Sequence, residues 1–181
     1  MKATGIVRRI DDLGRIVIPK EIRRTLRFRE GEPLEIYTDN TGEIILKKYS
    51  PIADLTEYAQ CIAGAVSSTT NALCYVTDRD YVIGASNGVK KEALSKPISK
   101  NIDKLMNMKQ SFTATSELDR LPISSELENE MFMCDVAVPI IFEGDCLGSI
   151  LINSNKSEMT ISHLKVIGQV NASILSTLMS N

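Results

Sequence analysis

The chain has 181 residues, of which 43% are hydrophobic and 24% charged, and its formal net charge is −2. This size and balance are typical of a globular protein with one or two domains and argue against a disordered or fibrous chain. No apolar run is long enough to span a membrane and no secretory signal precedes the first arginines, so we expect a cytoplasmic protein whose four cysteines are reduced.

The first fifty residues have a ββαββ pattern. Residues 4–10 and 15–18 are rich in β-branched side chains and flank the turn sequence Asp11-Asp12-Leu13-Gly14, which predicts a hairpin. Pro19 suits the first position of a helix, expected over residues 19–28 with Gly31 as its stop. Alternating apolar residues on either side of a turn at residues 39–42 predict a second hairpin.

Residues 1–50 are too few to bury a sufficient core alone, and neither a disulfide nor a metal is expected to stabilise them. Their short, β-branched edge strands invite pairing with another chain. We therefore expect residues 1–50 to form an obligate homodimer in which hairpins from two chains share one core.

A boundary at Ser50-Pro51 is expected to open a second domain, residues 51–181. The elements predicted there are a linker helix (52–69), a hairpin (72–76 and 81–85), a Lys-rich and mostly helical stretch (89–109), a loop with partial helix (111–129), a strand pair (133–142 and 146–153) and a final helix (160–179). This order predicts an α+β domain with an antiparallel sheet flanked by helices.

The final helix is expected to present one apolar face, made of Ile161, Leu164, Ile167, Val170, Ile174 and Leu178. Asn171 falls in a seam with 3-4 spacing, where it would set the register of a self-associating helix. A helix that packs on its own sheet, with Asn171 at the margin, is the favoured interpretation.

Positive charge is concentrated at the start of the chain. Residues 1–29 hold nine Lys/Arg against three Asp/Glu, a net charge of +6, whereas residues 51–181 hold ten against fifteen, a net charge of −5. Such a local excess indicates a polyanion partner, although a solvated basic face is an alternative. Five of the six residues Arg8, Arg9, Arg15, Lys20, Arg23 and Arg24 are arginines, whose forked guanidinium matches phosphate and guanine edges. This favours double-stranded DNA as the partner.

The sequence argues against an enzyme. It contains no G-x-S-x-G elbow, no P-loop and no cluster with metal-ligand spacing, so no catalytic residue, metal or cofactor is expected. His163 is the one histidine, and a surface or capping role is favoured over a ligand role. Asp11 and Asp12 either orient the arginines around them or make the turn, and turn-making is favoured.

The segment TGIVRRIDDLGRIVIP, residues 4–19, resembles the signature of the AbrB-type swapped-hairpin regulators, and residues 21–26, 34–37 and 45–49 continue the match. The resemblance implies an interleaved dimeric barrel, mainly β, that binds DNA. The implied DNA contacts are Arg8, Arg15, Arg23 and Arg24, with Arg9 close by, and Arg15 and Arg23 are expected to be largely exposed. Two-domain members of this class imply a sporulation regulator, both activator and repressor, that acts at the nucleoid.

The second domain resembles the GAF-like fold class. This leaves two roles open, a small-molecule pocket above the sheet or oligomerisation alone, with a homotetramer expected through this domain. The signature of the GAF domains that bind cyclic nucleotides is not present. An antitoxin of the swapped-hairpin class that also binds a protein partner is the alternative function, but such antitoxins usually end in a short disordered tail rather than a long foldable domain.

Overall fold

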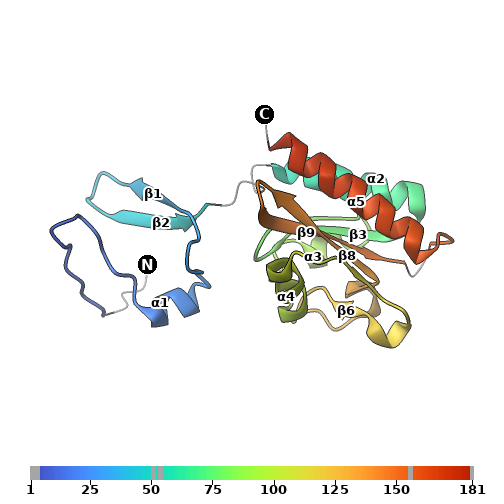
Figure 1. Ribbon diagram of the computed structural model, residues 1–181, viewed down its shortest axis with the longest axis horizontal. Helices are drawn as coiled ribbons and strands as arrows, with labels where there is room; N and C mark the ends of the chain where they lie inside the picture. The colour runs from blue at the N-terminus through green and yellow to red at the C-terminus, as the bar shows by residue number, and fades with distance from the viewer. Residues whose placement is uncertain (1–4, 50–51, 53–54, 155–156, 180–181) are drawn as a thin grey trace. The chain divides into compact units, whose positions relative to one another are not determined.

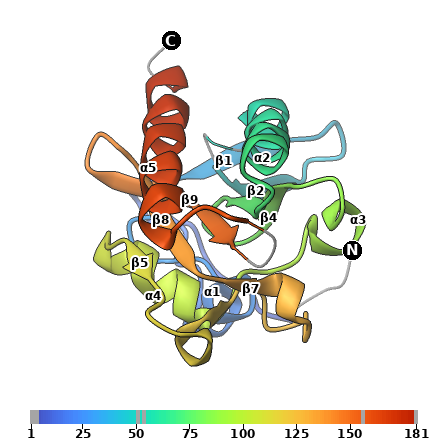
Figure 2. The ribbon, with the colours of Figure 1, turned by 90° about the vertical axis from the view of Figure 1, so that its right-hand side faces the viewer.

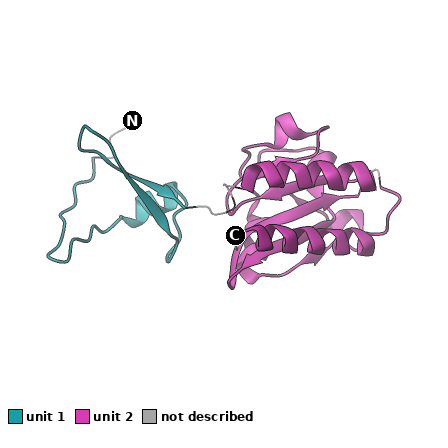
Figure 3. Ribbon diagram, turned by 90° about the horizontal axis from the view of Figure 1, so that it is seen from above, with its two compact units in different colours: residues 1–49 teal, residues 50–181 magenta. Residues whose placement is uncertain are grey.

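The computed structural model describes residues 5–49, 52, 55–154 and 157–179. The chain divides into two compact units, residues 1–49 and 50–181 (Figure 3). The boundary expected at Ser50-Pro51 lies outside the described residues, and so does Thr4, the first residue of the first expected strand.

The second predicted hairpin is confirmed in the N-terminal unit. Strands β1 (Leu34–Thr38) and β2 (Ile44–Lys48) pair antiparallel, with Leu34 opposite Lys48 and Thr38 opposite Ile44. The connecting turn is held by Asp39, whose Oδ1 accepts hydrogen bonds from the backbone N–H groups of Thr41 and Glu43 at 3.1 and 2.8 Å. An aspartate that accepts from the backbone two and four residues on is a common way to close such a turn.

The first predicted hairpin forms only its turn. Asp11 N–H donates to the Arg15 carbonyl at 3.1 Å and Gly14 N–H to the Asp11 carbonyl at 3.0 Å, while Gly14 adopts a φ of +75°. The described residues 5–19 contain no strand, and the side chains of Val7 and Val17 are 84% and 73% exposed. A strand needs a neighbouring strand to pair with, and among the described residues no strand is paired with residues 5–19.

Helix α1 (Lys20–Thr25) is shorter than the predicted 19–28 and ends well before Gly31. Pro19 is its N-cap, and Leu26 is its C-cap. Phe28 N–H donates back to the Arg23 carbonyl at 2.7 Å and Arg27 N–H to the Arg24 carbonyl at 3.3 Å, while Arg27 has a φ of +56°. These two bonds form a Schellman motif, which ends the helix with an arginine in the left-handed conformation that usually selects glycine.

The C-terminal unit is built on one antiparallel sheet in the order β4-β3-β9-β8-β5. Its strands are β3 (Leu73–Thr77), β4 (Val82–Ala85), β5 (Phe112–Thr113), β8 (Val136–Phe142) and β9 (Asp145–Asn153). Strands β8 and β9 meet at Glu143 and Gly144, both at positive φ, which gives the two-residue turn that suits a twisted hairpin. A separate pair joins β6 (Leu121–Pro122) to β7 (Met133–Cys134). The two hairpins predicted for this domain are confirmed, except that the predicted strand 133–142 begins at Val136, and Met133 and Cys134 belong to β7 instead.

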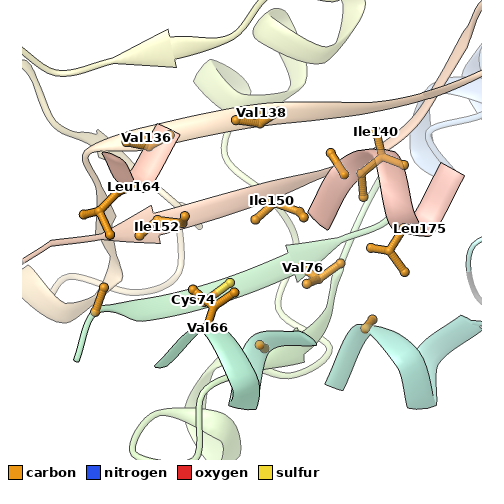
Figure 4. Packing of buried hydrophobic residues seen from close by; sticks show 14 of the residues in the cluster. Val66, Cys74, Val76, Val136, Val138, Ile140, Ile150, Ile152, Leu164 and Leu175 are labelled. Carbon is orange, nitrogen blue, oxygen red and sulfur yellow. The ribbon is translucent and has the colours of Figure 1, made fainter. Parts of the chain in front are cut away.

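Helices cover both faces of this sheet (Figures 1 and 2). Helices α2 (Thr56–Thr70) and α5 (Ile161–Leu178) lie side by side on one face. Their inward residues close a core with β3, β8 and β9 that also includes Ile52 (Figure 4). Helices α3 (Lys90–Ala93) and α4 (Lys100–Met108), with the short 3₁₀ helices η2 (Glu117–Asp119) and η3 (Glu130–Phe132), lie with a second buried cluster on the other face. The predicted α+β architecture is confirmed.

Three stretches differ from their predictions. The linker helix, expected over 52–69, is α2 and begins at Thr56. The stretch 89–109 breaks between α3 and α4 because residues 95–96 pair with Val82 at the sheet edge, through Ser95 N–H to Val82 O at 2.9 Å and Val82 N–H to Lys96 O at 3.0 Å. The predicted loop 111–129 contains β5 and β6, whose partners lie more than ten residues away and leave no local pattern.

The buried face of α5 matches the predicted one only in part: Leu164 is buried and Ile161 and Ile167 pack against the core, whereas Val170 and Ile174 are exposed. Leu164, Gly168, Ala172 and Leu175 are buried, and the helix packs on β8 and β9 as favoured. Small residues face the sheet because the helix approaches it closely: a Cβ on Gly168 would lie 3.0 Å from Val138 Cγ2. Val166, Val170 and Ile174 are instead exposed, and we call these three residues the α5 stripe. Asn171 is half-buried and donates to the Ile167 carbonyl at 2.9 Å.

Candidate nucleic-acid interface

Three of the five predicted DNA-contacting arginines flank the turn at Asp11–Gly14. Arg8 and Arg9 precede it and Arg15 follows it, and all three side chains are exposed. Arg8 donates from Nη1 to the carbonyl of its neighbour Val7 at 2.9 Å, which leaves the rest of its guanidinium in solvent. No ion pair among the described residues involves Arg8 or Arg9, so their charge is available to an outside anion.

Arg15 differs from its neighbours because a carboxylate holds it. Its Nε donates to Asp11 Oδ2 at 2.8 Å, with the Arg15 side chain 69% exposed. The other oxygen, Asp11 Oδ1, accepts from the backbone N–H groups of Leu13 at 3.1 Å and Arg15 at 2.7 Å. The backbone hydrogen bond from Arg15, and after it the side-chain bond, lowers the pKa of Asp11 below its ordinary value. Asp11 thus both makes the turn and orients an arginine.

Helix α1 supplies the other two arginines, in its last turn. Arg24 is exposed, whereas Arg23 is half-buried, so the expectation of a largely exposed Arg23 is wrong. The Nε atom of Arg23 is buried without a hydrogen-bond partner among the described residues. Arg23 is therefore less accessible to an outside anion than Arg24.

The remaining basic residues near α1 serve the fold. Glu32 lies between two cations, with its Oε1 at 3.5 Å from both Arg29 Nη1 and Lys48 Nζ. Lys48 Nζ also donates to the Arg27 carbonyl at 2.8 Å, which ties β2 to the end of α1. Glu32 offsets one of these two positive charges and holds both side chains within the unit. Arginines without a carboxylate partner among the described residues lie on the turn segment and on α1.

The face of the C-terminal sheet that carries α3 and α4 is filled by side chains. Tyr75 is fully buried and its hydroxyl donates to the Met131 carbonyl at 2.6 Å, while Phe132 packs beside it with ring centroids 6.3 Å apart. Burial raises the pKa of Tyr75, which keeps its hydroxyl a donor. His163 lies in the first turn of α5, where its backbone N–H donates to the capping Thr160 Oγ1 at 3.4 Å.

Among the described residues, no group of three or more His, Cys, Asp or Glu side chains is arranged to hold a metal ion. No helix of the described chain combines the length and the apolar character that a membrane span requires.

Comparison with known proteins covers nearly the whole chain. Residues 54–180 match the family model described as stage V sporulation protein T C-terminal, transcription factor. Residues 7–54 match the model described as antidote-toxin recognition MazE, bacterial antitoxin. Stage V sporulation protein T of Bacillus subtilis (strain 168) is 45% identical over 159 residues, which are 88% of this chain and 88% of that protein.

Solved structures match each unit separately. The N-terminal DNA recognition domain of the Bacillus subtilis regulator AbrB is 63% identical, covers 28% of this chain and 94% of its own, and has a TM-score of 0.25. A methyl-accepting chemotaxis protein is 13% identical over 69% of this chain and 88% of its own, with a TM-score of 0.54, so it shares the fold of the C-terminal unit. The chain therefore belongs to the stage V sporulation protein T family: it is a transcription factor with an AbrB-type DNA-binding domain followed by the C-terminal domain of that family.

Proposed function

We propose that this protein binds double-stranded DNA as an interleaved homodimer of residues 1–50 and regulates sporulation genes, as an activator at some promoters and a repressor at others. The contacts are made by Arg8, Arg9, Arg15, Arg23 and Arg24 in two copies. The supporting observation is the exposed positive charge of the turn segment and α1, which no carboxylate neutralises at Arg8, Arg9 or Arg24 among the described residues. The place of action is the nucleoid in the cytoplasm.

Burial within the N-terminal unit supports the interleaved dimer. Among residues 5–49 only Pro19 is buried. The exposed large apolar residues of this unit are Ile6, Val7, Ile10, Leu13, Ile16, Val17, Leu26, Ile36, Tyr37, Ile44, Leu46 and Tyr49. A soluble domain does not leave such a set in water, because their burial is its main source of stability. A second copy that adds its own strands would both cover them and complete the ladder that residues 5–18 lack.

For the C-terminal domain we propose a role in assembly, joining two DNA-binding dimers into a homotetramer. The α5 stripe supports this, because three branched apolar side chains line one exposed side of the helix. Tyr58 on the neighbouring helix α2 is exposed as well. The packed side chains around Tyr75 favour assembly over the alternative, a small-molecule sensor that binds above the sheet.

Two substitutions test the DNA interface. Arg15→Ala and Arg24→Ala each remove an exposed guanidinium, so each should weaken binding to the selected duplex about tenfold or more, since every contact occurs twice in a dimer. Gel-shift titrations of the full chain on duplexes selected from a randomised library and on random-sequence duplex measure the effect. The control is Lys47→Ala, which removes the same charge from the exposed face of β2 in the same unit. Wild-type affinity in both arginine variants would contradict the proposal.

The antitoxin alternative rests on the match of residues 7–54 alone. Residues 54–180 match a transcription factor model and form a folded domain with its own core rather than a short tail. The whole chain therefore supports a regulator whose partner is DNA.

A further inference from the structure

Among the five arginines assigned to DNA, Arg15 alone is paired with a carboxylate within the described residues. The partner, Asp11, is itself fixed, because its Oδ1 accepts two backbone hydrogen bonds within the turn. The position of Oδ2, and through it the position of the Arg15 Nε, is therefore set by the turn. A bond from a fixed carboxylate restricts a long side chain that would otherwise sample many rotamers.

The pairing uses only one edge of the guanidinium. Asp11 engages Nε, and no hydrogen bond from the two terminal nitrogens of Arg15 is found among the described residues. Those nitrogens form the edge that matches two acceptors in one plane, such as guanine O6 and N7 or two phosphate oxygens. The Asp11 carboxylate thus fixes the orientation of the Arg15 side chain, and both terminal guanidinium nitrogens remain able to donate to DNA.

The charge of Asp11 favours a base edge over a phosphate as the target of this fork. A carboxylate 2.8 Å from Nε offsets the attraction of Arg15 for a polyanion and repels phosphates nearby. Arg8, Arg9 and Arg24 carry no such partner and suit the backbone. A compensated arginine in a fixed orientation adds little to general affinity, but it can discriminate between bases.

We infer that Asp11 is a positioning residue that presents the Arg15 fork to a guanine edge, so that it determines sequence selectivity rather than overall affinity. The inference rests on the proposed function, in which Arg15 contacts DNA. Asp11 touches no base itself and acts through Arg15.

Asp11→Asn separates turn-making from positioning. The asparagine Oδ1 can still accept the backbone N–H groups of Leu13 and Arg15, so the turn is kept. Its NH₂ group replaces Oδ2 and cannot accept the Arg15 Nε–H. The matched control is Asp12→Asn, which removes the same charge one residue later, from an exposed side chain with no hydrogen bond or ion pair among the described residues.

The measurement is a selectivity ratio for the full chain, the dissociation constant on random-sequence duplex divided by that on the duplex the wild type selects from a randomised library. Asp11→Asn should lower this ratio about tenfold, while its affinity for random duplex stays equal or rises. Asp12→Asn should raise affinity for both duplexes alike and leave the ratio unchanged. An unchanged ratio in Asp11→Asn, or equal changes on both duplexes, would overturn the inference.

Two further variants keep the outcomes separate. When Arg15→Ala is already present, adding Asp11→Asn should not change the selectivity ratio any further. A further fall of the ratio in this double variant would mean that Asp11 does not act through Arg15. Arg15→Lys leaves Asp11 and the turn intact and keeps the charge, so it should retain affinity for random duplex and lose selectivity. Retained selectivity in Arg15→Lys overturns the inference even if Asp11→Asn fails to fold. Unchanged binding in both Arg15→Ala and Arg24→Ala, by contrast, would refute the proposed interface itself.

Discussion

At the scale of single residues, the environment separates side chains that look alike in the sequence. Arg15 is held by a carboxylate, Arg24 is free in solvent, and Arg23 has a buried Nε. All three belong to one basic stretch of the sequence. Under the proposed function, we expect these surroundings to give Arg15 a role in selectivity, Arg24 one in attraction to the DNA backbone, and Arg23 one in both packing and contact.

The cysteines should differ in reactivity for the same reason. Burial raises the pKa of Cys74 and of Cys134 to about 12, and Cys61 is exposed on α2. The thiolate is the reactive form, so at pH 8 only about one in ten thousand of the buried thiols is ionised. We expect iodoacetamide to label Cys61 in the native protein and to leave Cys74 and Cys134 unlabelled, whereas in urea all should react. Peptide mass spectrometry measures this, and equal labelling of Cys61 and Cys74 in the native state would contradict it.

At the scale of elements, close backbone approaches decide where glycine is required. On Gly148 in β9, a Cβ would lie 2.0 Å from the Thr77 carbonyl oxygen, and on Gly84 in β4 it would lie 2.7 Å from the Ala59 backbone. At Gly84 the neighbouring Gln60 side chain also binds the strand, donating to the Ala85 carbonyl at 2.6 Å. Helix α2 therefore sits directly on β4, which only a residue without a side chain permits.

Two glycine substitutions test whether these close backbone approaches require glycine. Gly148→Ala forces backbone apart, so it should lower the free energy of unfolding of the C-terminal domain by about 3 kcal/mol. Gly64→Ala, in the interior of α2 with nothing within 4 Å of the added Cβ, should raise it by about 0.5–1 kcal/mol because alanine favours the helix. Urea unfolding of the two variants and the wild type gives both values. A Gly148→Ala protein as stable as Gly64→Ala would rule out the close approach.

At the scale of the whole molecule, the exposed apolar residues of the N-terminal unit lead us to expect that its folding depends on a second chain. The fragment 1–50 should be dimeric wherever it is folded, because mass action couples its stability to association. Its melting temperature should rise with protein concentration, which circular dichroism at several concentrations can measure. Where the DNA binding of the fragment is also measured, the folded full chain that carries Lys47→Ala is the reference. A folded monomer in sedimentation would contradict the interleaved dimer.

Assembly through the C-terminal domain makes a separate prediction. Val170→Glu places a charge in the middle of the α5 stripe and should convert a tetramer to a dimer without unfolding the domain, whereas Gln169→Glu, beside it on the exposed surface, should not. Sedimentation velocity distinguishes the two, and a Val170→Glu tetramer would exclude the stripe as the interface.

The same variant should change how salt affects DNA binding. If Arg8, Arg9, Arg23 and Arg24 meet phosphates in one dimer, about eight contacts give a log–log salt slope of about −7. Two dimers joined on a long site should give a steeper slope and higher affinity through effective concentration. Salt titrations of wild type and Val170→Glu on one long duplex compare them, and equal slopes would mean that the C-terminal domain does not couple the DNA-binding units.

The features predicted correctly are local ones: the segregation of charge, the turn at Asp11–Gly14, the hairpin of β1 and β2, and the extents of β9 and α5. Net charge, turn chemistry and apolar period depend on neighbours along the chain, so they can be recognised without the fold. The arginines could likewise be recognised as candidate DNA contacts without the fold, because their clustering is a property of the sequence.

Only the tertiary structure decided what depends on residues far apart. The buried face of α5 follows from the closeness of β8 at Gly168, and the short strand β5 follows from its partner Ala137. The end of α1 follows from a backbone bond at Phe28 rather than from a glycine. Asp11 both makes the turn and orients Arg15, because its Oδ1 accepts from the turn backbone and its Oδ2 accepts from Arg15 Nε. In each case the free energy comes from a contact across space, which the order of residues alone does not reveal.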